Sequence, residues 1–270
     1  ISPATAKNWI RLKKLIPDIN GTDYSRDYIE RLVTDIKNGN IASLKSRRNK
    51  KSVSGRAVYK DYIDTTDNIS TVKAILSECE IITEQQLRII LAHFAIRLYK
   101  NSGEQTVNEK IWYKKKVPVC KNDTFNSLIF ELIGDSDLKN TDTDSISNIF
   151  SYDIKYVPSE DTLGFIYISL KDLGKRKGTG TYFTPAKTVR LLIDNLQEET
   201  NLLKHTFCDP CCGTGNFLIE LLNRNISIDN LYGYDIDPIS VTITKINLFL
   251  CTKNVTVNLL NRHFVCADTL

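Results

Sequence analysis

Hydrophobic residues recur at steps of three and four positions along much of the first half of the chain. Such a period places apolar side chains on one face of an α-helix. The clearest of these stripes runs through Leu87, Ile90, Leu91, Phe94 and Leu98. Thr83 precedes Gln86 by three residues, which is the spacing of a capping box and predicts that this helix begins there.

We predict from this pattern a mainly helical domain over residues 1–155. Its helices are expected at 4–15, 24–37, 68–77 and 83–99, and a polar loop at 140–147. The apolar stripes could serve as a docking surface. We favour a helix-bundle core, because burial of such stripes against one another is their usual purpose.

Beyond residue 155 the pattern changes to short apolar runs that alternate with amphipathic ones. Residues 158–170 predict a helix that begins with a proline and early acidic residues. Further helices are expected at 186–196, 217–222 and 239–250, and strands at 202–207, within 231–238 and at 263–268. This alternation predicts an α/β fold with a parallel sheet.

Composition narrows the class of protein. The chain has 270 residues, 41% of them hydrophobic and 25% charged, with a formal net charge of +4, which is typical of a soluble globular protein. It carries no apolar run of membrane-spanning length and no signal-peptide pattern, so we expect a cytoplasmic protein without a membrane partner. The 7 cysteines lack framework spacing and are expected to be reduced, and a metal site is disfavoured.

The most informative stretch is residues 208–217, which follow a predicted strand and open a predicted helix. Gly213 and Gly215 allow a sharp turn and a close ligand, and the helix start offers unpaired N–H groups. This pattern indicates a nucleotide-cofactor turn. A dinucleotide is disfavoured, because Leu218 occupies the place of the third small residue. Asp209 would repel a phosphate but suits an ammonium or sulfonium group.

The run Asp-Pro-Cys-Cys-Gly-Thr-Gly-Asn-Phe at 209–217 resembles the S-adenosyl-L-methionine-binding motif of DNA methyltransferases that methylate amino groups. Upstream, Gly-Thr-Tyr-Phe-Thr-Pro at 180–185 resembles the family's motif X, which closes over the methionine part of the cofactor. The resemblance implies that these two segments bind the cofactor through Tyr182, Phe183, Thr184, Pro185, Asp209, Pro210, Cys212, Gly213, Gly215, Asn216 and Phe217.

Two further acidic positions extend the resemblance. Asp235 lies 26 positions after Asp209 (235 − 209), close to the interval that places an acid against ribose hydroxyls. It matches the family's ribose-binding acid, and Ile236 follows it in the implied site. Asp237 is expected to cap the next helix instead. Asp268, with Thr269 beside it, matches the acid that accepts from the adenine amino group of the cofactor.

The resemblance implies a Rossmann-like S-adenosyl-L-methionine-dependent methyltransferase domain that starts at residue 156, with motifs X, I, II and III in that order. The family's Asn/Asp-Pro-Pro-Tyr/Phe motif is absent from the chain, so no residue is assigned as catalytic. We expect the 270 residues to be the amino-terminal part of a longer enzyme and to be inactive alone.

The implied function is methylation of adenine N6 in double-stranded DNA by a restriction-modification system, either as a type I modification subunit or as a fused type II enzyme. Specificity and restriction subunits are the implied partners. Residues 45–51 hold five basic residues in seven and are a candidate contact to DNA phosphates, and the alternative is an exposed solvated loop. A methyltransferase acting on RNA or protein and a non-catalytic cofactor-binding module stay open as alternatives.

Overall fold

The computed structural model describes residues 10, 16, 23–37, 56–78, 82–104, 120–134, 141–171 and 183–269. Contacts divide the chain into two compact units, residues 1–53 and 54–270. In the first unit the structure describes α2 (Arg26–Lys37), which confirms the helix expected over 24–37. The basic stretch 45–51 lies outside the described residues, as does the helix expected over 4–15 apart from Ile10.

The second unit contains a parallel sheet of three strands in the order β1-β2-β3. They are β1 (Phe207–Asp209), β2 (Leu231–Asp235) and β3 (Phe264–Cys266). The prediction of a strand over 202–207 was wrong for its first part, because Leu202–Lys204 form a 3-10 helix. The Asn201 side chain caps that helix by accepting from the Leu203 N–H, and only Leu202 is buried. The apolar residues Leu202 and Leu203 therefore belong to a helical turn and not to a strand.

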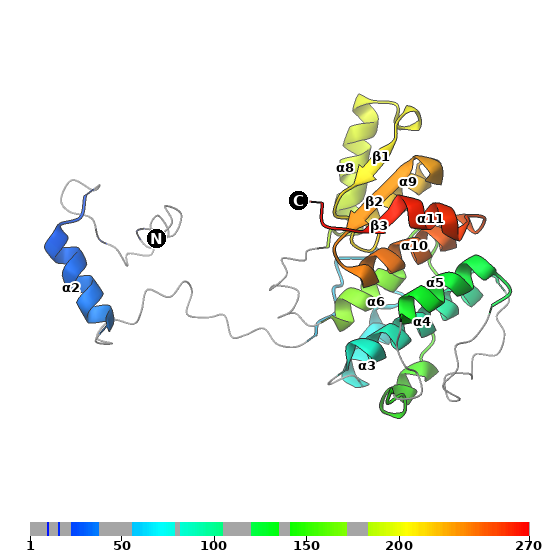
Figure 1. The fold of residues 1–270 in the computed structure, drawn as a ribbon, viewed down its shortest axis with the longest axis horizontal. Helices are drawn as coiled ribbons and strands as arrows, with labels where there is room; N and C mark the ends of the chain where they lie inside the picture. Colours follow the sequence, from blue (N-terminus) through cyan, green and yellow to red (C-terminus); the bar gives the residue numbers. More distant parts are fainter. Residues whose placement is uncertain are drawn as a thin grey trace. The chain divides into compact units, whose positions relative to one another are not determined.

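The helices α8 (Ala186–Glu199), α9 (Asn216–Asn223), α10 (Pro238–Thr252) and α11 (Val257–His263) alternate with these strands (Figure 1). The helix α10 packs against β2 and β3 and also against the helices that come earlier in the chain. Every residue of α10 from Ile239 to Leu250 is buried. The helix α10 is therefore buried on every face, between the sheet and the earlier helices. Its buried polar residues, such as Thr244 and Asn247, are hydrogen-bonded.

The earlier helices are α3 (Ile69–Glu78), α4 (Glu84–Asn101), α5 (Asp123–Ile133) and α6 (Thr162–Leu170). The predicted capping box is confirmed, because the Thr83 side chain accepts from the Gln86 N–H and the Gln86 side chain accepts from the Thr83 N–H. Residues Asp144–Ser151 form a 3-10 helix, η2, so the polar loop predicted at 140–147 ends earlier than expected. None of the described helices is both long enough and apolar enough to cross a membrane.

The core runs across the predicted domain boundary at residue 155. Phe125 of α5 stacks on Tyr99 of α4 with ring centroids 4.2 Å apart, and its centroid lies 5.5 Å from that of Phe249 on α10. The described residues of the second unit therefore share one continuous core, from Tyr62 to Phe264. The boundary itself stays a prediction of the sequence pattern.

Candidate functional site

The carboxyl ends of the three strands meet at one edge of the sheet, because all three run parallel. Asp209 is the last residue of β1 and Asp235 the last of β2. The segment after β3 crosses these ends, since the Ala267 N–H donates to the Asp235 carbonyl at 3.0 Å and the Thr269 hydroxyl donates to the Pro210 carbonyl at 2.9 Å. The structure thus places Asp209, Asp235 and Asp268 along the same edge.

The turn between β1 and α9 is tied to β2 by hydrogen bonds from its backbone N–H groups. The Cys212 N–H donates to the Tyr234 carbonyl, and the Gly213 N–H donates to Oδ2 of Asp235, each at 2.8 Å. Gly213 and Gly215 have φ of 52° and 95°, in the left-handed region where a side chain is strained. We call residues 210–215 the glycine turn. Its shape depends on both glycines, as the sequence predicted.

The upstream segment 183–185 lies against this turn. A Cβ built on Gly213 would be 3.4 Å from the Phe183 ring. The Asn216 side-chain amide donates to the Thr184 carbonyl at 3.0 Å, and Pro185 occupies the N-cap position of α8. Two segments that the sequence separates by more than twenty residues are therefore in contact. Tyr182, the remaining residue predicted here, lies outside the described residues.

Exposure differs among the predicted site residues. Ile236 keeps 70% of its surface exposed, and Asp268 and Thr269 are exposed too. Cys212 is a buried residue of the glycine turn, and burial raises the pKa of its thiol far above the usual range. A buried thiol with a raised pKa is a poor nucleophile, so we assign Cys212 no chemical role.

Asp209 is held in an unusual electrostatic setting for a surface edge. Burial raises the pKa of its carboxyl, the neighbouring Asp235 raises it further, and the hydrogen bond from the Cys211 N–H opposes both effects. A positive charge beside Asp209 would relieve this repulsion. The edge is thus better suited to a cationic group than to a phosphate.

Asp237 has a structural task, as the sequence predicted. It caps α10 by accepting from the Ile239 N–H at 3.1 Å, and its other oxygen accepts from the Tyr167 hydroxyl at 2.5 Å and from Lys171 Nζ at 2.8 Å. Burial alone would raise the pKa of this carboxyl, but the hydrogen bonds from Lys171 and Tyr167 bring it below its usual value.

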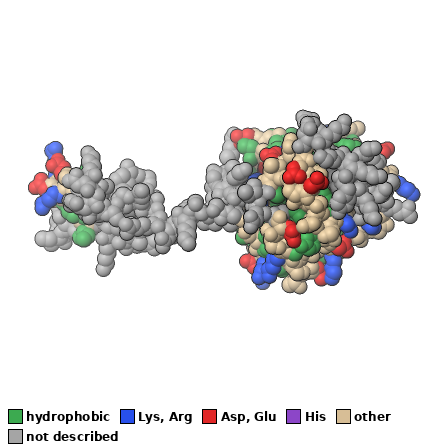
Figure 2. Space-filling view, turned by 90° about the horizontal axis from the view of Figure 1, so that it is seen from below, with side chains coloured by type: hydrophobic (Ala, Val, Ile, Leu, Met, Phe, Trp, Pro, Cys, Tyr) green, Lys and Arg blue, Asp and Glu red, His purple; other side chains and the backbone are tan. Residues whose placement is uncertain are grey.

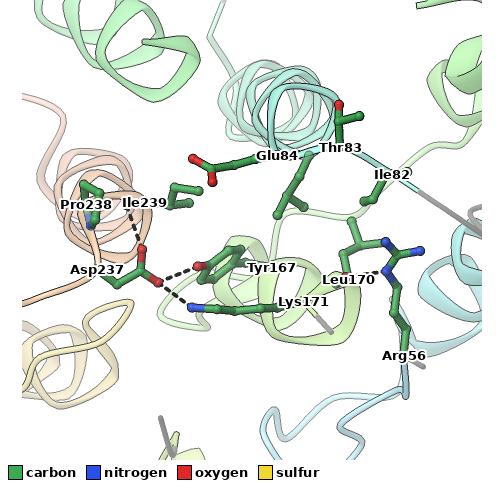
Figure 3. Close-up of a pocket in the computed structure, with 11 residues that line it drawn as sticks. Arg56, Ile82, Thr83, Glu84, Tyr167, Leu170, Lys171, Asp237, Pro238 and Ile239 are labelled. Carbon is green, nitrogen blue, oxygen red and sulfur yellow. Dashed lines mark hydrogen bonds and ion pairs between the residues drawn. The ribbon is translucent and has the colours of Figure 1, made fainter. Parts of the chain in front are cut away.

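Two hollows adjoin the edge. One of about 240 Å³ lies between the starts of α4 and α10 and the end of α6, with Asp237, Tyr167 and Lys171 in its wall (Figure 3). The other, of about 420 Å³, is mostly apolar and follows β1 between α8 and α9. The second hollow alone reaches predicted site residues, namely Asp209, Pro210 and Phe217.

Sequence reasoning missed a buried carboxylate beneath the glycine turn. The helix expected from Pro158 begins only at Thr162, and Asp161 is its N-cap. Asp161 is 1% exposed and accepts from the hydroxyl of Thr214, inside the glycine turn. An acid next to a Thr-Leu-Gly run could have been recognised as a cap, but its contact with residue 214 is not visible in the sequence.

One face of the second unit can be examined for a basic surface that would favour nucleic-acid binding. On the face of the second unit drawn in Figure 2, acidic and basic side chains are interspersed, and the described atoms there form no continuous basic patch. The candidate phosphate contact at 45–51 is not among the described residues.

Comparison with known proteins identifies the segment that carries this edge. Residues 158–270 match the profile of the family described as N-6 DNA Methylase. The chain is 39% identical over 100 residues to the type II methyltransferase M.VspI of a Vibrio species. The aligned residues cover 37% of this chain and 24% of that protein. It is 30% identical over 142 residues to the type I restriction enzyme MjaIX methylase subunit of Methanocaldococcus jannaschii, covering 47% of this chain and 24% of that subunit.

These matches confirm the resemblance to N6 DNA methyltransferases that the motifs indicated. The chain spans about a quarter of the length of each of these two relatives. No solved structure matches it significantly.

Proposed function

We propose that this chain forms the cofactor-binding part of an S-adenosyl-L-methionine-dependent DNA methyltransferase that methylates adenine N6 in a restriction-modification system. The observation that carries the proposal is the meeting of segments 183–185, 209–217 and 235–236 at one sheet edge, inside the stretch that matches the N-6 DNA methylases. The three parallel strands are, in this proposal, the start of a Rossmann-like sheet.

The residues at the edge fit the chemistry of this cofactor. Each oxygen of Asp235 accepts one backbone N–H, from Gly213 and from Asp237. A carboxylate offers about four acceptor positions, so two remain for the ribose hydroxyls. The raised pKa of Asp209 indicates a place for a positive charge, which the amino group of the cofactor carries.

The other proposed contacts to the cofactor are made by exposed side chains at the same edge. Ile236 is an exposed apolar side chain beside Asp235 and can pack on the adenine ring of the cofactor, and Asp268 can accept from its amino group. Phe183 and Thr184 border the methionine end, with Tyr182 preceding them. When bound, S-adenosyl-L-methionine supplies a methyl group on a sulfonium centre. The chain's own task is to hold it in a fixed orientation, a main source of rate acceleration in such transfers.

Double-stranded DNA is the proposed substrate, and specificity and restriction subunits are the proposed partners. Support for both comes from the two relatives, one a type II methyltransferase and the other a methylase subunit of a type I restriction enzyme. One relative is of each type, so both arrangements stay open.

The test is a calorimetric titration of the complete gene product with S-adenosyl-L-methionine, for the wild type and for Asp268→Asn. Asp268 is exposed, so its substitution disturbs the fold little. We expect affinity to fall by about tenfold, the cost of one hydrogen bond to a charged group. Asp229→Asn is the matched control, because Asp229 is also exposed but precedes β2 at the opposite edge of the sheet.

Methylation is tested by incubating genomic DNA with the gene product and labelled cofactor and identifying the methylated nucleoside by mass spectrometry. N6-methyladenine in DNA is the expected product. Transfer of label only to RNA or to protein would overturn the proposed substrate. A wild type that binds no S-adenosyl-L-methionine would overturn the cofactor site.

A further inference from the structure

The Asp161 carboxylate is buried beneath the glycine turn and is hydrogen-bonded on both of its oxygens. It is 1% exposed and accepts from four donors drawn from four segments. These are the Tyr62 hydroxyl at 2.5 Å, the Thr214 hydroxyl at 2.5 Å, the Gly164 N–H at 2.7 Å and the Asn247 side-chain amide at 2.6 Å. A buried carboxylate is tolerated only when it is satisfied in this way.

One of these donors sits inside the glycine turn. Thr214 lies between Gly213 and Gly215 and is 1% exposed. Its hydroxyl is within 2.5 Å of Asp161 Oδ2 and 2.8 Å of the Tyr62 hydroxyl, and its carbonyl accepts from Asn247 at 2.9 Å. Both the side chain and the backbone of Thr214 are thus fixed from below. The outer face of the turn remains available to a ligand.

Tyr62 extends this network to the second cofactor segment. Its ring meets the Phe183 ring edge-on, with centroids 6.2 Å apart and planes at 83°. Its carbonyl accepts from the Ala186 N–H, at the first residue of α8, at 3.1 Å. Tyr62 therefore contacts the glycine turn through its hydroxyl and segment 183–186 through its ring and backbone. It lies outside the stretch that matches the N-6 DNA methylases.

The fit around the carboxylate leaves no spare room. A Cβ built on Gly164 would lie 2.1 Å from Asp161 Oδ2 and 2.4 Å from the Thr214 hydroxyl. The approach of α6 to the glycine turn therefore requires a glycine at this position. Burial raises the pKa of Asp161 while the hydrogen bonds oppose that rise, so each lost donor leaves a less favourable buried acid.

We propose that Asp161 and Tyr62 are positioning residues of the cofactor site. They hold Thr214, and through it the glycine turn, at a fixed place against Phe183, without touching the ligand. Cofactor affinity then depends on side chains beneath the site that were not predicted to bind it. This inference rests on the proposed function for the identity of the ligand, but the positioning itself can be measured in the free protein.

The experiment compares Thr214→Val and Tyr62→Phe with Thr242→Val in the complete gene product. Thr214→Val removes one hydroxyl, and Tyr62→Phe removes another but keeps the ring on Phe183. Thr242 is a matched control, because it is 3% exposed and its hydroxyl also bonds a carboxylate, that of Glu131 at 3.2 Å, away from the glycine turn. Each protein is titrated with S-adenosyl-L-methionine, and its amide hydrogen exchange is followed without ligand.

We expect Thr214→Val and Tyr62→Phe to weaken binding by about fivefold to tenfold, the effect of one hydrogen bond. Exchange of the amides in peptide 211–216 should accelerate by a similar factor in both, because these amides open locally when the turn is released. In the double variant the two losses should not add, since both hydroxyls hold one residue. Thr242→Val should change neither quantity.

Two outcomes overturn the inference. Exchange of peptide 211–216 that is unchanged in both variants would show that the network does not hold the turn. Accelerated exchange with unchanged affinity would show that the turn's position is irrelevant to binding. A wild type that binds no S-adenosyl-L-methionine would overturn the proposed function and the ligand named here. The exchange data alone would then decide whether Asp161 and Tyr62 position the turn.

Discussion

Two buried regions of the unit 54–270 both exclude water, one by packing of aromatic rings and the other by hydrogen bonding around a carboxylate. Between α4, α5 and α10, the rings of Tyr99, Phe125 and Phe249 exclude water by packing. Beneath the glycine turn, Asp161 is buried to a similar extent but is surrounded by hydrogen-bond donors. Packing forces are weak for each atom and have no preferred direction, whereas hydrogen bonds to a carboxylate fix the direction of every partner.

The difference teaches which region sets stability and which sets geometry. An aromatic core can shift slightly after a substitution and still bury its surface. A buried carboxylate with four donors cannot shift in this way, because each donor must stay within hydrogen-bond distance of it. Substitutions in the first region should therefore change mainly the free energy of unfolding, and substitutions in the second should also change the shape of the proposed cofactor site.

The largest expected effect tests the aromatic core. Phe125→Ala should lower the free energy of unfolding by about 3–5 kcal/mol, because Phe125 is fully buried and leaves a cavity. Urea denaturation followed by fluorescence measures this loss. Phe130→Ala on the same helix is the control, since Phe130 is 52% exposed, and should cost far less. A Phe125→Ala protein that stays stable but loses cofactor binding would break the comparison.

A smaller effect concerns His93, which is 3% exposed and packs against the rings of Phe94 and Phe150. Burial, helped by the charge of Arg97, lowers the pKa of His93 to about 3. A histidine with a depressed folded pKa contributes stability above its unfolded pKa of about 6.5, and that stability is lost as pH falls. Between pH 7 and pH 5 the loss should be about 2 kcal/mol.

Urea titrations at several pH values measure this slope, and His93→Gln should flatten it because glutamine does not titrate. His263→Gln provides a comparison, since His263 is also buried but its Nδ1 donates to the Leu231 carbonyl at 3.0 Å. An unchanged slope in His93→Gln would contradict the assignment to His93.

The smallest effect concerns the cap of α10. Lys171→Met removes one of the groups that lower the pKa of Asp237. A depressed acid contributes stability above its unfolded pKa of about 3.9 and loses it as pH falls further. The variant should therefore be about 1 kcal/mol less stable than the wild type at pH 7, with the gap closing below about pH 4.

Lys155→Met is the control for this prediction, because the ion pair of Lys155 with Asp67 is exposed and contributes little. Chemical denaturation of both variants from pH 7 to pH 3 gives the comparison. A gap for Lys171→Met that stays constant with pH would mean that lost packing, and not the charge of Lys171, causes the effect.

Local signals in the sequence predicted local structure well. The helix α4 was predicted from its stripe and its capping box at Thr83, and the cap of α10 from Asp237 before a proline. The strand expected over 202–207 was wrong in its first part, because apolar composition does not separate a 3-10 turn from an extended run. Both glycines of the turn were correctly expected to matter, since a positive φ has a signature in residue type.

By itself the sequence determined the family resemblance and the order of the glycine turn and the acids, because these depend on residue type and short spacing. Only the tertiary structure decided what lies beneath the turn. Tyr62 and Asp161 are separated by 99 positions, and Asp161 and Asn247 by 86, yet all three converge on Thr214. Contacts between distant segments arise from how helices pack, and no local pattern records which donors will meet one buried carboxylate.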